Sequence, residues 1–195
     1  MSSSAGRGNL IVISGPSGAG KTSLCNALLE GLAGSTWSVS APTRPMRAGE
    51  VDGQSYRFIS RAEFERTREQ VEFLEWAEYL GHLYGTPLQP VLEAVKAGRY
   101  IILEIDVQGG IQVARKMPES IRIFLLPPDM QSLQARLAGR KTESADHQAR
   151  RLAQADGEIA VARDSGSYDF FVTNDQLSDT VEAVLNIIHR EAVRA

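Results

Sequence analysis

The sequence lacks the features that would place the chain in a membrane or in an oxidising compartment. It has one cysteine, Cys25, which cannot form an internal disulfide and suits a reducing cytoplasm. It has no run of about 18 apolar residues, so we expect no membrane partner. The N-terminal segment MSSSAGRG is small and polar and lacks the apolar stretch of a signal peptide, so we expect residues 1–8 to form a disordered tail. These absences predict a cytoplasmic protein.

The sequence also lacks an excess of positive charge and a cluster of metal ligands. The formal net charge is −3, which argues against binding a nucleic acid polymer across the whole surface. Any phosphate site must therefore come from a local cluster. The three histidines show no metal-ligand spacing with one another or with the cysteine, so we assign no zinc site. No interface pattern stands out, and the sequence predicts no particular oligomeric state.

Four short apolar segments have the composition of strands that are buried on both faces of a sheet. They are Leu10–Ser14, Tyr100–Asp106, Ile121–Leu126 and Phe170–Asn174. A helical pattern follows the first, with an apolar side made of Leu24, Ala27, Leu28 and Leu32. A last helical pattern covers about 177–193, with the inward side Leu177, Val181, Val184, Leu185 and Ile188. Buried strands that alternate with helices predict an α/β fold with a parallel central sheet covered by helices.

Two segments interrupt this alternation. Residues 37–88 are polar, rich in turn signals and contain half-exposed strand patterns such as YRFI, so we expect a small β-rich insertion. Residues 129–163 are charged and helical, and Asp129 is the expected N-cap after two prolines. The predicted core then consists of residues 9–36, 89–128 and 164–195.

The segment GPSGAGKT, Gly15–Thr22, matches the phosphate-binding pattern G-x-x-x-x-G-K-[ST]. Its glycines allow backbone N–H groups to point at a phosphate, and the helix that starts near Gly20 adds its positive end. Lys21 can reach the β- and γ-phosphates, and the Thr22 hydroxyl can hold Mg²⁺. A chance Gly-rich turn is the alternative, but the pattern follows a strand and opens a helix, as the motif requires. We expect a nucleoside triphosphate with Mg²⁺ to bind Gly15, Pro16, Ser17, Gly18, Ala19, Gly20, Lys21, Thr22 and Ser23.

Two arginines in the loop SVSAPTRPMRAGE can clamp a second phosphate. Arg44 and Arg47 are close together, and paired guanidinium groups bind phosphate oxygens by parallel hydrogen bonds. Tyr56 and Tyr84 could each add a hydroxyl donor. The alternatives are a solvated basic loop and two half-buried packing tyrosines.

The order of these and other motifs resembles guanylate kinase. The motifs are GPSGAGKTSL, SVSxxTRxxRxGExxGxxY, EFLEWAE, YGTP, LEIDVQG, IFLLPP, RLxxR, RLxxAxxE and VTND, and they cover about residues 10–188. The resemblance implies a P-loop kinase core, a GMP-binding insertion at residues 37–88 and a mobile helical lid at residues 129–163. It also implies phosphoryl transfer from ATP to GMP, with dGMP as a second acceptor and Mg²⁺ as the cofactor.

Glu75 lies in the centre of the strand pattern EFLEWAEY. Alternation places it on the same side as Phe73, Ala77 and Tyr79, where an unpaired carboxylate is costly. The residues alone favour a glutamate paired with a nearby arginine. The resemblance instead implies that the carboxylate accepts both N1–H and the amino group of guanine. It further implies guanine contacts by Ser40, Glu75, Thr86 and Asp106, and GMP phosphate contacts by Arg44, Arg47, Tyr56 and Tyr84.

The charged helical segment contributes three arginines. Arg136 and Arg140 are four residues apart and share a helical face, which by itself is typical of solvated surface. The resemblance places Arg136, Arg140 and Arg151 over the phosphates, and together with Lys21 and Arg44 they form the expected catalytic set. Phosphoryl transfer needs alignment and positive charge more than it needs a general base.

Two further carboxylates end an apolar run. Glu104 or Asp106 could lie near Mg²⁺ or its waters, because ligands gather at the carboxyl edge of a parallel sheet. The resemblance assigns Asp106 to the base side, so neither is a predicted metal ligand. Asn174, in VTND, matches a family position near the nucleotides.

The chain departs from the family pattern at Ala41-Pro42, where hydroxyl residues are common, and at His82, where asparagine is usual. The first departure removes loop hydrogen bonds but no residue assigned to catalysis.

Two other functions compete with the enzyme. An interaction module of this fold typically has a degraded phosphate loop, whereas the loop is intact here. A P-loop kinase for another acceptor is disfavoured by Glu75.

Overall fold

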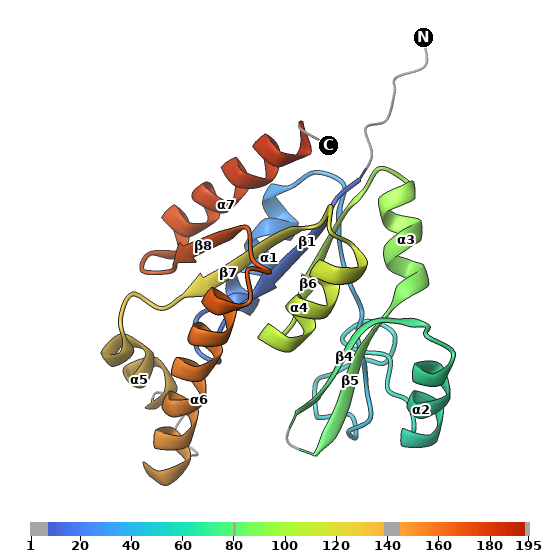
Figure 1. Ribbon diagram of the computed structural model, residues 1–195, viewed down its shortest axis with the longest axis horizontal. Coiled ribbons are helices and arrows are strands. Elements are labelled where there is room, and N and C mark those ends of the chain that lie inside the picture. The colour runs from blue at the N-terminus through green and yellow to red at the C-terminus, as the bar shows by residue number, and fades with distance from the viewer. Residues whose placement is uncertain (1–7, 80, 139–144, 194–195) are drawn as a thin grey trace.

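Five parallel strands form the sheet at the centre of the protein. This computed structural model describes residues 8–79, 81–138 and 145–193. In spatial order the strands are β2 (Ser35–Trp37), β6 (Tyr100–Glu104), β1 (Leu10–Ser14), β7 (Ile121–Leu126) and β8 (Phe170–Thr173). Because β1 lies between β6 and β7 and all three run in parallel, their carboxyl ends meet at one edge (Figure 1).

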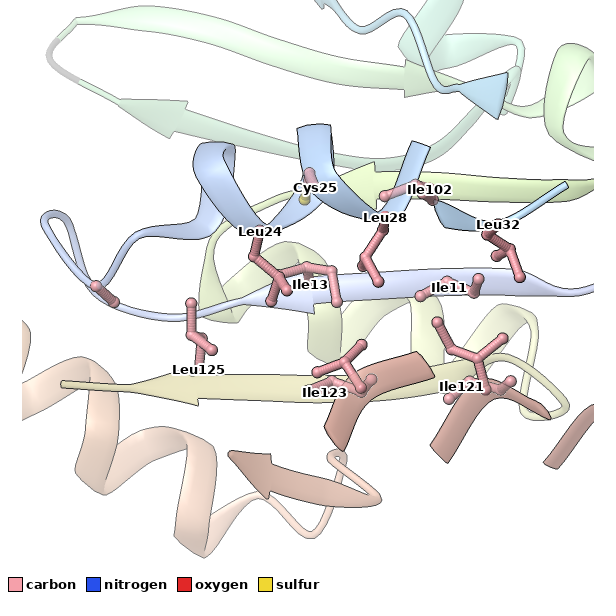
Figure 2. Packing of buried hydrophobic residues seen from close by; sticks show 13 residues of the cluster. Ile11, Ile13, Leu24, Cys25, Leu28, Leu32, Ile102, Ile121, Ile123 and Leu125 are labelled. Atoms are coloured by element: carbon pink, nitrogen blue, oxygen red, sulfur yellow. The ribbon is translucent and has the colours of Figure 1, made fainter. Parts of the chain in front are cut away.

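Helices cover both faces of this sheet. They are α1 (Lys21–Gly31) and α7 (Leu177–Ala192) on one face, and α3 (Leu88–Lys96) and α4 (Val107–Lys116) on the other. Ile11 and Ile13 of β1 pack with α1 and α7, whereas Leu10 and Val12 pack with α3 and α4. Figure 2 shows the apolar side chains of α1 pointing at β1. Since neither side of β1 meets water, its sequence is continuously apolar, and the predicted α/β fold is confirmed.

The strand predictions hold, but the last strand and helix are less buried than the sequence suggests. β8 is an edge strand, and Phe171 is 40% exposed while Phe170 packs against the core. Leu177, at the first turn of α7, is also 40% exposed, so its predicted inward position is wrong. Val184 and Ile188, farther along α7, are fully buried as expected. An apolar run at the edge of a sheet therefore resembles a central strand in sequence alone.

The predicted insertion contains a second, antiparallel sheet in the order β3–β5–β4 and a helix that the sequence analysis missed. Its elements are β3 (Ala41–Pro42), α2 (Arg61–Glu69), β4 (Phe73–Tyr79) and β5 (His82–Pro87). Phe64 of α2 packs with Phe73 and Leu83 in a small separate core. The Ser60 hydroxyl caps α2 by accepting the backbone N–H of Glu63 at 3.1 Å. This S-x-x-E capping pattern is visible in the sequence.

The described parts of the predicted lid segment are mainly helical. Its helices are α5 (Met130–Ala138) and α6 (Ala145–Asp164), which pack around Leu133, Leu137 and Ala155. Asp129 accepts the backbone N–H of Ser132 at 2.6 Å, so its predicted capping role is confirmed. Figure 1 shows α6 and the insertion extending from the same end of the core.

Two smaller predictions are corrected. Residues 56–59, the YRFI pattern, are described and form no strand. The N–H groups of Arg57 and Ile59 donate to the carbonyls of Ser40 and Pro42 at 2.9 and 3.2 Å, but Pro42 has no N–H with which to continue the pairing. Gly8 was expected in a disordered tail but is buried and donates its N–H to the Val95 carbonyl at 3.1 Å. The rest of that predicted tail, residues 1–7, lies outside the described residues. No helix in the described part of the chain has the length and apolar composition needed to cross a bilayer.

Leu28 tests the larger core, because its side chain is fully buried between α1 and the sheet. Leu28→Ala removes buried methyl groups and leaves a cavity, so we expect it to lower the free energy of unfolding by about 2–5 kcal/mol. Glu30→Ala, an exposed change on the same helix, should alter that energy by less than about 0.5 kcal/mol. Urea unfolding followed by circular dichroism measures both, and equally small effects would place Leu28 outside the core.

Candidate active site

One cavity of about 690 Å³ lies where the core, the insertion and the lid segment meet. The sequence-predicted residues that line it are Gly15, Ser17, Lys21, Thr22, Ser40, Tyr56, Glu75, Tyr84 and Asp106. The phosphate loop after β1 and the glutamate of β4 are about 60 residues apart in sequence but border the same space. The fold therefore joins a phosphate site to a buried carboxylate.

The phosphate loop connects β1 to α1 and begins the helix without a side-chain cap. Gly20 is the N-cap residue, with a φ of 97° in the left-handed region that favours glycine. The N–H groups of the first helical turn are therefore directed at a ligand position. Lys21 Nζ donates to the carbonyls of Gly15 at 2.6 Å and Pro16 at 3.1 Å. Burial lowers the pKa of Lys21, and nearby carboxylates, Glu104 first among them, oppose that shift.

Thr22 and Glu104 bring two oxygen ligands together beside the loop. The Thr22 hydroxyl, in the first turn of α1, donates to Glu104 Oε1 at 3.0 Å, at the end of β6. Because the hydroxyl donates its hydrogen bond to the carboxylate, its lone pairs remain directed elsewhere and can bind a cation. Mg²⁺ prefers oxygen ligands and commonly uses one or two protein groups together with substrate phosphates. The residues present thus fit a Mg²⁺ ion.

Glu75 is buried, with 4% of its surface exposed, and its side chain borders the cavity. Thr86, its cross-strand neighbour on β5, donates its hydroxyl to Glu75 Oε1 at 2.5 Å. Gly109 of α4 lies against the other oxygen, since a Cβ there would be 2.6 Å from Oε2. Burial raises the pKa of Glu75 to about 7, although the Thr86 hydrogen bond acts in the opposite direction.

The predicted alternation along β4 is wrong at its first residue. A register shift between Phe73 and Glu75 turns Phe73 into the core of the insertion, while Glu75, Ala77 and Tyr79 border the cavity. Such an irregularity changes which side of a strand a residue faces. In the described structure the hydrogen-bond partner of the carboxylate is the Thr86 hydroxyl and not an arginine.

The other residues expected to contact guanine surround this carboxylate. Asp106 caps α4 by accepting the N–H of Gly109 at 2.8 Å, and its side chain also lines the cavity. Ser40 lines the cavity from the loop before β3. Thr86 is fully buried behind Glu75, so it reaches the cavity only through that carboxylate.

Arg44 is held by a neighbouring carboxylate. Two bonds of 2.6 Å join its guanidinium group to Glu50, which raises the pKa of Arg44 and holds the pKa of Glu50 at about 2. Its Nε donates to the Tyr84 hydroxyl at 3.2 Å, and its guanidinium carbon lies 5.0 Å from the centre of the Tyr56 ring. Both tyrosines line the cavity. Arg47 is exposed, and its backbone N–H donates to Glu50 at 2.8 Å.

The described lid arginines contact the phosphate loop and the turn after β8. Arg136 donates to the carbonyl of Asn174 at 3.0 Å, outside the cavity lining. Arg151 donates to the hydroxyl of Ser17 in the phosphate loop. Arg140, the third predicted lid arginine, lies outside the described residues.

Comparison with known proteins agrees with this geometry. The family model described as "Guanylate kinase" matches residues 7–191. The chain belongs to the guanylate kinase family. It is 48% identical to the guanylate kinase of Rubrobacter xylanophilus, over 94% of this chain and 95% of the relative. It is 47% identical to that of Streptococcus pneumoniae, over 96% of this chain and 89% of the relative.

A solved structure extends the match to three dimensions. The crystal structure of guanylate kinase from Anaplasma phagocytophilum is 32% identical, has a TM-score of 0.77 and covers 96% of this chain and 87% of its own. The resemblance and the P-loop kinase fold expected from the sequence are thereby confirmed. By family the protein is a nucleoside-monophosphate kinase.

The sequence analysis of this kinase missed several residues that shape the site. Glu50 lies inside the motif RxGE, three residues after Arg47, and that spacing marks it as the partner of the arginine loop. Glu158 of α6 borders the cavity, accepts a hydrogen bond from Gln154 at 2.9 Å, and has its pKa raised by burial. Trp37 lines the cavity from a strand too short to leave a pattern.

The raised pKa of Glu75 predicts how stability depends on pH. The folded protein binds this proton more tightly than the unfolded chain, so its contribution is largest below pH 4.5 and is lost as pH rises to about 7. Glutamine does not titrate, so Glu75→Gln should keep its stability as the pH rises, whereas the parent loses stability. We expect the variant to match the parent at pH 4.5 and to exceed its free energy of unfolding by up to about 3 kcal/mol at pH 8.

The matched control is Glu78→Gln, the same change at an exposed position of β4. Urea unfolding of the three proteins at both pH values gives the differences. If Glu75→Gln and the parent differed by the same amount at pH 4.5 and pH 8, the carboxylate would have an ordinary pKa.

Proposed function

We propose that this protein transfers the γ-phosphoryl group of ATP to GMP with Mg²⁺, giving ADP and GDP, and that dGMP is a second acceptor giving dGDP. The observation that carries the proposal is the shared cavity, which the phosphate loop and the buried Glu75 carboxylate both border. Holding donor and acceptor in one site makes the transfer effectively intramolecular. The relatives named guanylate kinases support the same reaction.

Glu75 selects the acceptor base in this proposal. Guanine presents two adjacent donors, N1–H and the exocyclic amino group, and one carboxylate can accept both. Adenine has no donor at N1, so it would leave the buried carboxylate poorly paired. Sites built around such a hydrogen bond can reject the wrong ligand by ~10⁴–10⁵. The contact does not involve the sugar, which supports dGMP as the second acceptor.

The GMP phosphate lies at the tyrosine end of the cavity. Tyr84 accepts a hydrogen bond from Arg44, so its own hydroxyl is free to donate a hydrogen bond to a phosphate oxygen. Tyr56, beside the same guanidinium group, is the second donor. Arg44 orders both tyrosines and adds positive charge, and Arg47 extends that charge from the exposed loop.

The donor phosphates bind the loop at residues 15–23. Lys21 exchanges its two loop carbonyls for phosphate oxygens, and Arg151 approaches from α6, where it already contacts Ser17. Arg136 and Arg140 complete the positive charge from α5 and the segment after it. This positive charge stabilises the negatively charged phosphoryl group while it is transferred. The acceptor phosphate is already ionised at neutral pH, so the reaction needs no general base.

Thr22 and Glu104 hold the Mg²⁺ ion in this proposal, Thr22 directly and Glu104 through the Thr22 hydroxyl. Bound there, Mg²⁺ would neutralise the charge that develops on the phosphates during transfer. A cytoplasmic location, where ATP and GMP are available, remains an inference from the sequence, and the free, buried Cys25 supports it.

The first test is phosphoryl transfer from MgATP to GMP, dGMP, AMP, CMP and UMP in parallel. We expect fast turnover with GMP, slower turnover with dGMP and negligible turnover with the others.

Glu75→Gln should reduce kcat/KM for GMP by ~10²-fold or more, because the amide offers only one acceptor oxygen. Glu78→Gln is again the control. Turnover of another acceptor would keep the kinase and discard guanine, whereas folded protein that binds GMP without turnover would indicate an interaction module.

The second test concerns the metal. Glu104→Gln keeps the shape of the side chain but weakens its hold on the Thr22 hydroxyl. Groups that orient a metal ligand typically contribute 10–100-fold to metal affinity or activity, so we expect the Mg²⁺ concentration for half-maximal rate to rise by about 10-fold. Rates measured across a Mg²⁺ titration at saturating ATP and GMP give this value. An unchanged midpoint would remove Glu104 from the metal site.

A further inference from the structure

Two side-chain amides that do not line the cavity hold its two halves. Asn174, in the turn after β8, contacts the phosphate loop. Gln112, on α4, contacts the strand that carries Glu75. Neither is a sequence-predicted site residue with a stated role, and each is fixed at both ends of its amide by hydrogen bonds.

Asn174 is 5% exposed and lies directly behind the phosphate loop. Its Nδ2 donates to the Ala19 carbonyl at 2.7 Å, and its Oδ1 accepts the Thr180 hydroxyl of α7 at 3.0 Å. The contact with the loop is close, because a Cβ at Gly20 would lie 2.3 Å from Nδ2. Since Thr180 fixes the oxygen end, the amino end is directed at the loop.

The contact with the Ala19 carbonyl sets the orientation of a peptide group. The bond between Ala19 and Gly20 is planar and trans, so its C=O and N–H point in opposite directions. A carbonyl held on the Asn174 side therefore turns the Gly20 N–H to the opposite side of the loop. Anion-binding loops require this arrangement, with N–H groups directed at the phosphate and carbonyls directed away.

We infer that Asn174 is a positioning residue for the phosphoryl donor. It does not line the cavity, and it acts by fixing the Ala19–Gly20 peptide group. This inference rests on the proposed binding of ATP at the loop. Because Arg136 contacts the backbone carbonyl of Asn174 and not its side chain, a side-chain change at this position spares the lid contact.

Gln112 is the counterpart on the acceptor side, from an independent observation. Its Oε1 accepts the backbone N–H of Trp76 at 3.2 Å, and its Nε2 donates to the Trp76 carbonyl at 2.7 Å. β4 is an edge strand, and these are the two groups that a further strand would otherwise pair. Since Trp76 follows Glu75 directly, Gln112 fixes the backbone from which the carboxylate extends, and it positions the acceptor base.

The same chemical change tests both residues. Asn174→Asp and Gln112→Glu keep the size of each side chain and its acceptor oxygen but remove the N–H donor. We expect Asn174→Asp to raise KM for ATP by about 10-fold or more and to leave KM for GMP within about twofold. Gln112→Glu should do the reverse. Steady-state kinetics with one substrate varied and the other saturating gives all four values.

Exposed positions on α7, which carries Thr180, and on α4, which carries Gln112, supply matched controls. Asn186→Asp on α7 and Gln108→Glu on α4 make the same changes at the surface and should leave both KM values unchanged. An equal rise of both KM values in one variant would show a general structural role and overturn the assignment of that residue. Unchanged KM values would overturn it as well.

Two further measurements keep the test decisive. If Asn174→Asp fails to fold, as judged by thermal unfolding, Thr180→Val releases the oxygen end of the amide and should raise KM for ATP alone. No selective rise in that variant would overturn the inference. The parent enzyme is assayed in parallel, so an absence of ATP-dependent turnover in the parent would contradict the proposed function and not the positioning roles.

Discussion

The position of β1 in the centre of a parallel sheet is the constraint from which the site follows. A strand that is apolar on both sides is stable only when helices cover both faces, and here α1 and α7 lie opposite α3 and α4. Its neighbours β6 and β7 then run in the same direction, and polar residues that follow each strand gather at one edge. The phosphate loop, Glu104 and Asp106 come together for this reason, although the sequence separates them widely.

Buried polar side chains of the site are satisfied by partners from other elements of the fold. Glu75 accepts a hydrogen bond from the Thr86 hydroxyl on the neighbouring strand, and the Asn174 amide links the phosphate loop to α7. Away from the site, at the amino-terminal end of β7, Arg122, 9% exposed, pairs with Asp169 at 2.8 Å. A buried polar group without its partner destabilises the fold, so these contacts select one arrangement of segments over others that would bury the same apolar area. The precision of the site is therefore a property of its buried supports.

The central strands, the phosphate loop and the helix after it could be predicted from sequence because local pattern determines them. A continuous apolar run, a glycine at the helix start and a basic residue after it leave few alternatives at Lys21. The irregular start of β4 could not be predicted, since the register shift that separates Phe73 from Glu75 depends on pairing with β5. The partnership of Asn174 with Ala19 was equally inaccessible, because 155 residues separate the two in sequence. What sequence pattern misses here is the choice of tertiary partner.

The cations of the site differ in how readily they can change partners. Lys21 and Arg136 are held by neutral backbone carbonyls, whereas Arg44 is held by the two oxygens of the Glu50 carboxylate. A charged acceptor forms the stronger bond, so a phosphate displaces a carbonyl more easily than it displaces a carboxylate. Lys21 and Arg136 are thus suited to move onto a nucleotide phosphate. Arg44 is suited to remain where it is and to act through the tyrosines that it orders. Under the proposed function, the loop arginine is then a fixed support for the acceptor, and the mobile charge belongs to the donor side.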